Sequence, residues 1–150
     1  MASAKIVYAS MTGNDEEIAD ILEEAFENLD VDVDVSEISQ TDAAEFEDYD
    51  IDIIVTYTYG DGELPDEAVD FFEDLQEEDL SGKIFGCAGS GDTFYDDFAK
   101  SVDDFADAFK KTGAVEGAPV VKIDLAPEED DITALQAFAK QLLATYNAQN

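Results

Sequence analysis

The feature that most constrains the fold is a regular alternation of strand-like and helix-like segments along the whole chain of 150 residues. Apolar runs at 6–9, 51–56 and 84–89 are typical of strands buried on both faces, and 31–35 and 121–125 alternate like half-exposed strands. Between the strands, apolar residues recur at helical spacing, within the segments 18–29, 69–75, 98–109 and 132–143. The alternation predicts an α/β fold, a five-stranded parallel sheet with helices on both faces.

The strand patterns also predict the order of the strands in the sheet. The first, third and fourth runs are nearly continuous in apolar residues and should be internal, whereas the second and fifth alternate and should be edges. The doubly wound order 2-1-3-4-5 satisfies both conditions, but the order 3-2-1-4-5 would expose the third strand. In the first order, the ligand crevice lies between strands one and three. The length suits one domain, so we expect a single domain over 1–150.

The composition narrows the classes of function. There are 39 acidic residues against 7 lysines, so the net charge is −32. This charge repels nucleic acid and anionic lipid and favours basic partner surfaces, although adaptation to high salt would also explain it. Histidine is absent, and the single cysteine, Cys87, lies in an apolar run and should be buried. Neither a signal peptide nor a membrane span is visible, so we expect a cytoplasmic protein.

Three loops follow strands and should therefore meet at the carboxyl edge of the sheet. The first loop, residues 10–16, joins small residues and hydroxyls to the start of a helix. Backbone N–H groups and the helix dipole can hold a phosphate there without a cation. An ordinary helix cap with a tight turn would explain the same residues.

The second and third loops each place an aromatic residue beside a Gly-Asp pair. The second contains Thr58-Tyr59-Gly60-Asp61, and the third runs from Gly89 through Gly91-Asp92 to Tyr95. A loop tyrosine is usually a partly packed surface residue. Two of them flanking one crevice indicate instead a planar ligand stacked between the rings.

The three loops together resemble those of flavodoxins. Ser10-Met11-Thr12-Gly13-Asn14-Asp15-Glu16 is similar to the phosphate loop Thr/Ser-x-Thr-Gly-Asn-Thr-Glu. Thr58-Tyr59-Gly60-Asp61 is similar to the flavin loop Thr-Trp/Tyr-Gly-Asp, and Gly91-Asp92-Thr93-Phe94-Tyr95 to the loop Gly-Asp-x-x-Tyr. The resemblance covers essentially the whole chain. Because the fifth strand has no long insertion, the chain resembles the short-chain flavodoxins of Gram-positive bacteria.

The resemblance implies a flavodoxin-like fold, non-covalently bound FMN and a low-potential one-electron carrier, not an enzyme, that shuttles electrons between redox enzymes. It implies no catalytic or metal-binding residues, and a monomer whose partners are basic-surfaced donors and acceptors. The cofactor-binding residues that it implies are Ser10, Met11, Thr12, Gly13, Asn14, Asp15, Thr58, Tyr59, Gly60, Asp61, Gly89, Gly91, Asp92, Tyr95 and Phe98.

The resemblance also implies roles for these residues. The flavin ring should lie between Tyr59 and Tyr95, with its phosphate on residues 10–15 near Thr58, and its pyrimidine edge on backbone groups around Asp92. The Gly60-Asp61 peptide should lie beside flavin N5, where the glycine allows the Gly60 carbonyl to turn.

Asp15 departs from the family pattern, which has threonine at this place. Two unit charges about 4 Å apart repel by roughly 4 kcal/mol at an effective dielectric near 20, so an acid beside the phosphate is costly. We therefore expect Asp15 to turn outward and serve the first helical turn, where an acid is favoured. We also expect Asp15→Thr to tighten FMN binding, as a flavin titration would measure.

Three other functions compete with the carrier. A phosphoreceiver signalling module shares the strand order, but needs clustered acids after the first strand and a lysine after the fifth; here Lys122 lies inside the fifth strand. A flavin-dependent reductase is disfavoured by the absence of histidine and of extra loops. A flavodoxin-like maturation protein for a metalloenzyme remains open.

Overall fold

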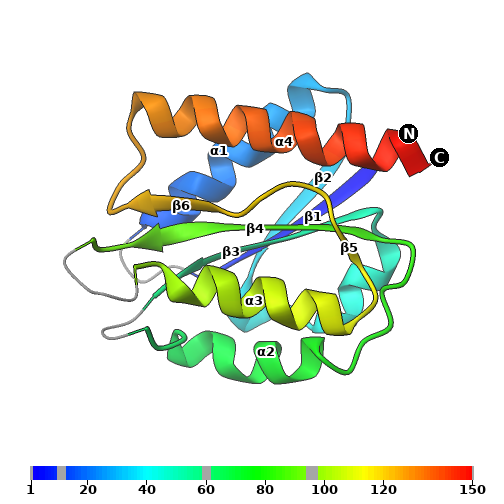
Figure 1. Ribbon diagram of the computed structural model, residues 1–150, viewed down its shortest axis with the longest axis horizontal. Coiled ribbons are helices and arrows are strands. Elements are labelled where there is room, and N and C mark those ends of the chain that lie inside the picture. Colours follow the sequence, from blue (N-terminus) through cyan, green and yellow to red (C-terminus); the bar gives the residue numbers. More distant parts are fainter. Residues whose placement is uncertain (1, 10–12, 59–61, 94–97, 150) are drawn as a thin grey trace.

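The computed structural model describes residues 2–9, 13–58, 62–93 and 98–149, and its strands form one parallel sheet. The order β2-β1-β3-β4-β5, with β6 also paired to β4, confirms the predicted order 2-1-3-4-5 (Figure 1). The outer strands are those with alternating sequences, because one face of each stays partly exposed. The strands are β1 (Ser3–Tyr8), β2 (Asp32–Glu37), β3 (Ile51–Tyr57), β4 (Ile84–Gly91), β5 (Val115–Glu116) and β6 (Val121–Asp124).

The fifth position of the sheet is divided between two short strands. β5 pairs with the start of β4, at Ile84 and Phe85, and β6 pairs with its end, from Ala88 to Gly91. Between them lies Pro119, which has no N–H group to donate to a ladder. The predicted strand 121–125 is β6, which ends one residue earlier because Leu125 takes a left-handed φ of 61°.

The four predicted helices are all present, and two cover each face of the sheet. α1 and α4 lie on one face, and α2 and α3 on the other (Figure 1). Their bounds are α1 (Asn14–Asn28), α2 (Val69–Leu75), α3 (Lys100–Lys111) and α4 (Glu129–Gln149). Three short 3₁₀ helices were not predicted, because they carry no apolar period: η1 (Ile38–Gln40), η2 (Ala43–Asp48) and η3 (Asp66–Ala68).

The sheet divides the apolar core into two halves. Ile6, Ile53 and Phe138 belong to the half beneath α1 and α4. The half beneath α2 and α3 is rich in phenylalanine, and the rings of Phe85 and Phe109 stack with their centroids 4.7 Å apart. The core therefore fixes the strand ends, and with them the loops at the carboxyl edge.

Cys87 lies in the half of the core beneath α2 and α3. The side chain is fully buried, as predicted, and burial raises the pKa of its thiol well above the ordinary value. It therefore behaves as a small apolar residue.

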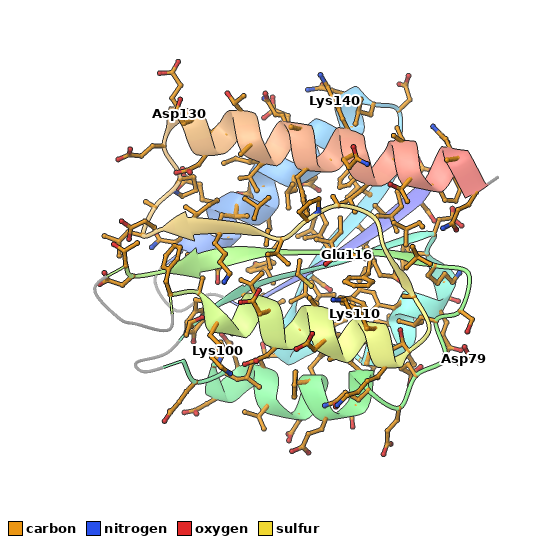
Figure 2. All side chains as sticks on the ribbon, in the orientation of Figure 1. Asp79, Lys100, Lys110, Glu116, Asp130 and Lys140 are labelled. Carbon is orange, nitrogen blue, oxygen red and sulfur yellow. The ribbon has the colours of Figure 1, made fainter. Side chains whose placement is uncertain are left out.

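Many acidic and lysine side chains project from the helices and turns, as Asp79, Asp130 and Lys140 do in Figure 2. Lys5, Asp15 and Asp52 are exceptions, because they are buried. Across the described ranges, we find no helix with the length and apolar character that crossing a bilayer requires.

Candidate functional site

The carboxyl ends of β1, β3 and β4 meet at one edge, where the three predicted loops begin. The Ala9 N–H group donates to the Val55 carbonyl at 2.9 Å, and the Thr58 N–H group donates to the Ser90 carbonyl at 3.3 Å. Seven predicted site residues lie outside the described ranges, and the flanking residues locate the site: Ser10, Met11, Thr12, Tyr59, Gly60, Asp61 and Tyr95.

The first loop leads into α1 through a glycine in the left-handed region. Gly13 has a φ of 93°, which glycine adopts without the cost that a side chain would add. Gly13 is exposed, and a Cβ built on it would meet no described atom within 4 Å. Among the described residues, no side chain caps α1, which begins at Asn14. Its first-turn N–H groups therefore suit an anion.

Asp15 turns inward, so the expectation that it faces solvent is wrong. Its side chain is 1% exposed. The Ser90 N–H group donates to Asp15 Oδ1 at 3.1 Å, and the Ser90 hydroxyl donates to the same oxygen at 2.7 Å. These two hydrogen bonds tie the start of α1 to the end of β4 and compensate part of the cost of burial.

The environment of Asp15 favours its neutral form. Burial raises the pKa of this carboxyl to about 7, although the hydrogen bonds from Ser90 oppose the shift and the charge of Glu67 adds to it. Asp15 Oδ2 is buried and has no hydrogen-bond partner in the part of the chain that is described. The site thus holds a polar oxygen without a partner beside the predicted phosphate loop.

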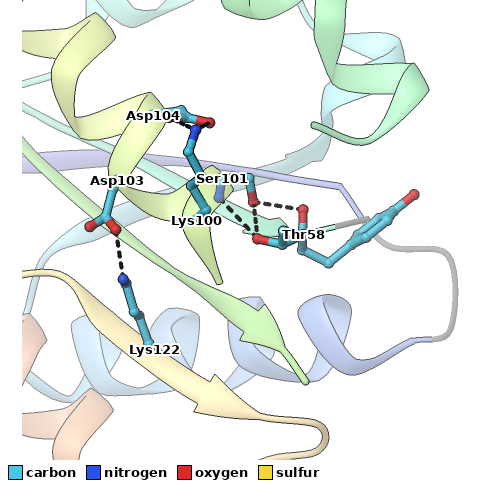
Figure 3. A network of polar contacts seen from close by, with 7 residues as sticks. Thr58, Lys100, Ser101, Asp103, Asp104 and Lys122 are labelled. Carbon is cyan, nitrogen blue, oxygen red and sulfur yellow. Dashed lines mark hydrogen bonds and ion pairs between the residues drawn. The ribbon is translucent and has the colours of Figure 1, made fainter. Parts of the chain in front are cut away.

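The second loop is anchored to the first turn of α3. The Ser101 N–H group donates to Thr58 Oγ1 at 2.9 Å, and the Ser101 hydroxyl donates to the Tyr57 carbonyl at 2.7 Å (Figure 3). The Thr58 and Ser101 hydroxyl oxygens also lie 2.9 Å apart. Thr58 therefore lies at the predicted edge, with its hydroxyl already hydrogen-bonded within the protein.

Sequence reasoning missed Ser101 and Ser90. Ser101 is the second residue of α3, and nothing local marks it as the partner of Tyr57 and Thr58, which lie 44 and 43 residues earlier in the chain. Ser90 lies inside a buried strand, and nothing local marks it as the partner of Asp15.

Gly89 and Gly91, which were predicted in the third loop, lie at the end of β4, and close packing explains both glycines. A Cβ on Gly89 would lie 1.9 Å from the Thr56 carbonyl oxygen, and one on Gly91 would lie 2.7 Å from the Ala99 nitrogen. Their role toward a flavin stays a prediction, as does that of Asp92, which lies at the same edge and is partly exposed. Phe98 is partly buried and packs against the half of the core beneath α2 and α3.

Ion pairs and hydrogen bonds brace α3 and the third loop. Lys122 Nζ lies 2.6 Å from Asp103, and Lys100 Nζ lies 3.0 Å from Asp104 (Figure 3). The Thr93 N–H group donates to Asp124 at 3.3 Å, which joins the third loop to the end of β6. Within the described ranges, no group of three His, Cys, Asp or Glu side chains suits a metal ion.

The residues described at this edge fit FMN. The first turn of α1, which no described side chain caps, suits a phosphate. Asp15 Oδ2, which is buried without a partner among the described residues, belongs to the same turn. The switch point of an open sheet of order 2-1-3-4-5 is where doubly wound proteins bind their ligands, and a helix start suited to phosphate at that point is typical of the mononucleotide-binding class.

Comparison with known proteins gives the family. The family model described as flavodoxin matches residues 6–138. The chain is 42% identical over 151 residues to probable flavodoxin 1 of Bacillus subtilis, with 100% of this chain and 96% of that protein covered. The chain therefore belongs to the flavodoxin family.

Solved structures of flavodoxins have the same fold as this chain. A flavodoxin from Streptococcus pneumoniae TIGR4 superposes with a TM-score of 0.94 at 58% identity, covering 95% of this chain and 99% of that one. A short-chain flavodoxin associated with a non-canonical PDU bacterial microcompartment gives a TM-score of 0.95 at 53% identity, covering 97% and 99%. These similarities confirm the short-chain type.

Flavodoxins are FMN-containing electron carriers, so this protein transfers electrons between redox proteins and is not an enzyme. The expected cofactor is thereby confirmed. The phosphoreceiver alternative is removed, because it belongs to a different family.

Proposed function

We propose that this protein is a low-potential one-electron carrier, a single domain over 1–150 that holds FMN at the carboxyl edge of β1, β3 and β4. The observation that carries the proposal is the hydrogen bonding that joins the three loops there. Asp15 of the first loop bonds to Ser90, the Ser90 carbonyl accepts from Thr58, and Thr58 bonds to Ser101. The loops therefore start from one braced framework, which pre-organises a ligand site.

The proposed contacts follow the order of the loops. Residues 10–15 hold the phosphate through backbone groups and hydroxyls, and Thr58 lies at the same edge. Tyr59 and Tyr95 cover the two faces of the ring, and backbone groups from Gly89 to Asp92 bind its pyrimidine edge. The Gly60-Asp61 peptide faces the reducible part of the ring, and Phe98 supports the third loop from the core.

FMN supplies the redox chemistry, because it accepts electrons one at a time. The chain sets the potential through its charge. One carboxylate about 10 Å away, at an effective dielectric near 40, disfavours added negative charge by roughly 0.8 kcal/mol, on the order of 35 mV. With a net charge of −32, several such carboxylates act together and lower the potential.

The same charge defines the partners. A protein of net charge −32 is attracted to basic surfaces and repelled by acidic ones, so its donors and acceptors present basic patches around their redox centres. The attraction also raises the rate of encounter, and salt weakens it.

Electron delivery to cytochrome c, a basic haem protein, tests the proposal. The FMN-loaded protein is fully reduced without oxygen and mixed with oxidised cytochrome c from about 10 mM to about 500 mM NaCl, and the rate should fall at least about tenfold as salt screens the attraction. Ferricyanide, a small anionic acceptor, is the control, and its rate should rise with salt. A rate to cytochrome c that is independent of salt would contradict the proposed partners, and no transfer to either acceptor would contradict the carrier.

A further inference from the structure

We propose that Asp15 binds the FMN phosphate as a neutral carboxyl group, so that FMN binding takes up a proton at Asp15. The inference rests on the FMN site proposed above and adds a role for a residue in which this chain departs from the flavodoxin loop pattern. It also explains how an acid can occupy the first turn of a helix that holds a phosphate.

The two oxygens of Asp15 have different surroundings, and this difference is the basis of the inference. Oδ1 accepts both hydrogen bonds from Ser90, at 3.1 Å from the N–H group and 2.7 Å from the hydroxyl. Oδ2 is buried with no partner among the described residues. A buried polar atom without a partner is costly, and a proton on Oδ2 turns that oxygen into a donor.

The position of Asp15 in the fold makes an anion the natural acceptor. Asp15 is the second residue of α1, in the first turn whose N–H groups no described side chain caps. The phosphate loop 10–13 leads directly into this turn. A neutral Oδ2–H group adds a donor to those N–H groups, whereas an ionised carboxylate would repel the phosphate dianion.

The charged groups that face Asp15 favour its neutral form. Ser90 on β4 brings no charge, but its two hydrogen bonds lower the pKa of Asp15 and so oppose the larger effect of burial. From η3 the charge of Glu67 raises the pKa of Asp15, in addition to the larger effect of burial. On β3, burial first and then the charges of Glu67, Asp15 and Asp66 raise the pKa of Tyr57 to about 12, so this phenol stays protonated and brings no charge.

The affinity for FMN should fall as the pH rises above neutral. The pKa of Asp15 is about 7 before a ligand arrives, so the carboxyl is mostly ionised at pH 8. The phosphate of FMN is then a dianion, since its second pKa is about 6. Binding at this pH must therefore protonate Asp15, and it becomes weaker as the pH rises further.

Calorimetry of FMN binding at about pH 8, in buffers of different ionisation enthalpy, counts the protons taken up. The wild-type apoprotein should take up between about half a proton and one proton per FMN more than Asp15→Asn, whose amide does not titrate and still offers a donor. Asp15→Thr, which also lacks the carboxyl, gives a second reference.

Glu17→Gln is the matched control, because it removes the same charge from an exposed residue of α1 that lies just outside the phosphate loop. It should take up as many protons as the wild type. In fluorescence titrations, the Kd of the wild type and of Asp15→Asn should agree near pH 6, and the wild type should be weaker by at least about tenfold near pH 9.

Two results would overturn the inference: equal proton uptake by the wild type, Asp15→Asn and Asp15→Thr, or a ratio of Kd values that does not change with pH. Failure of the proposed function looks different, because FMN would then bind to none of the proteins at any pH.

Discussion

At the scale of single residues, three buried titratable side chains, Lys5, Asp15 and Asp52, differ in the partners that the fold gives them. Lys5 is 2% exposed, but forms ion pairs with Asp34 and with Glu45. Burial tends to lower the pKa of Lys5, and the hydrogen bond and charge of Asp34 outweigh it, so the pKa is raised. Asp15 has two hydrogen bonds to one oxygen. Asp52 is fully buried, and both its carboxylate oxygens lack partners among the described residues.

Asp52 makes stability depend on pH. Burial raises the pKa of Asp52 from an ordinary 3.8 to about 9. The charge of Lys83 lowers this pKa and the charge of Asp50 raises it, but both effects are smaller than that of burial. The folded protein therefore keeps a proton that the unfolded chain loses, and this stabilisation is lost as the pH rises from about 4 to about 9. Asp52→Asn, which cannot ionise, should match the wild type near pH 4 and exceed its free energy of unfolding by at least about 1 kcal/mol at pH 8.

Urea unfolding of the apoprotein at a series of pH values measures this difference. Asp48→Asn is the matched control, because Asp48 is exposed and loses the same charge. If Asp52→Asn and Asp48→Asn raised the free energy of unfolding equally at pH 8, the effect would come from total charge and not from the burial of Asp52.

The direction of the Asp15 side chain could not be predicted from the sequence. Its partner Ser90 is 75 residues further along the chain, and only the pairing of the strands brings the two together. The neighbouring residues indicate only the start of a helix, where an acid normally faces solvent. Two donors and a buried position outweighed that preference.

At the scale of secondary-structure elements, the period of apolar residues predicted the helices and most of the strands. It did not predict the division of the fifth strand, because β5 has only two residues and no period can show in so short a run. The edges were predicted correctly, since an edge strand keeps one polar face. The contacts between elements at the site were not, because they depend on tertiary packing.

The link between α3 and the second loop gives a prediction at this scale. Ser101 is fully buried, and its hydroxyl donates to the Tyr57 carbonyl at 2.7 Å. Ser101→Ala removes this donor from a buried carbonyl, so the free energy of unfolding should fall by about 1–3 kcal/mol. FMN affinity should fall with it, because the loop after Thr58 loses an anchor.

Denaturant unfolding and a flavin titration of the same variant measure both effects. Ser39→Ala is the control, because that hydroxyl is exposed and its bond to Glu37 is 3.5 Å long. An unfolding free energy for Ser101→Ala equal to that of Ser39→Ala would show that the link contributes nothing.

At the scale of the whole molecule, the net charge of −32 and the fold act on different properties. The sheet and its two apolar half-cores position the loops, and they would do so with a neutral surface. The charge is proposed to act on the choice of partners and on the potential of the cofactor. Three loop patterns predicted the cofactor, which the family confirms, whereas the basic surfaces that composition predicts for the partners stay a prediction.

The most direct test of the account is the measurement of the midpoint potentials of the FMN-loaded protein, by stepwise reduction under a visible spectrometer at low and high salt. We predict two separate one-electron steps, with the second more than about 100 mV below that of free FMN, as a few carboxylates at 35 mV each require. Salt should raise that second potential by screening the carboxylates. A second potential at or above that of free FMN, or a colourless protein that takes up no FMN, would contradict the account.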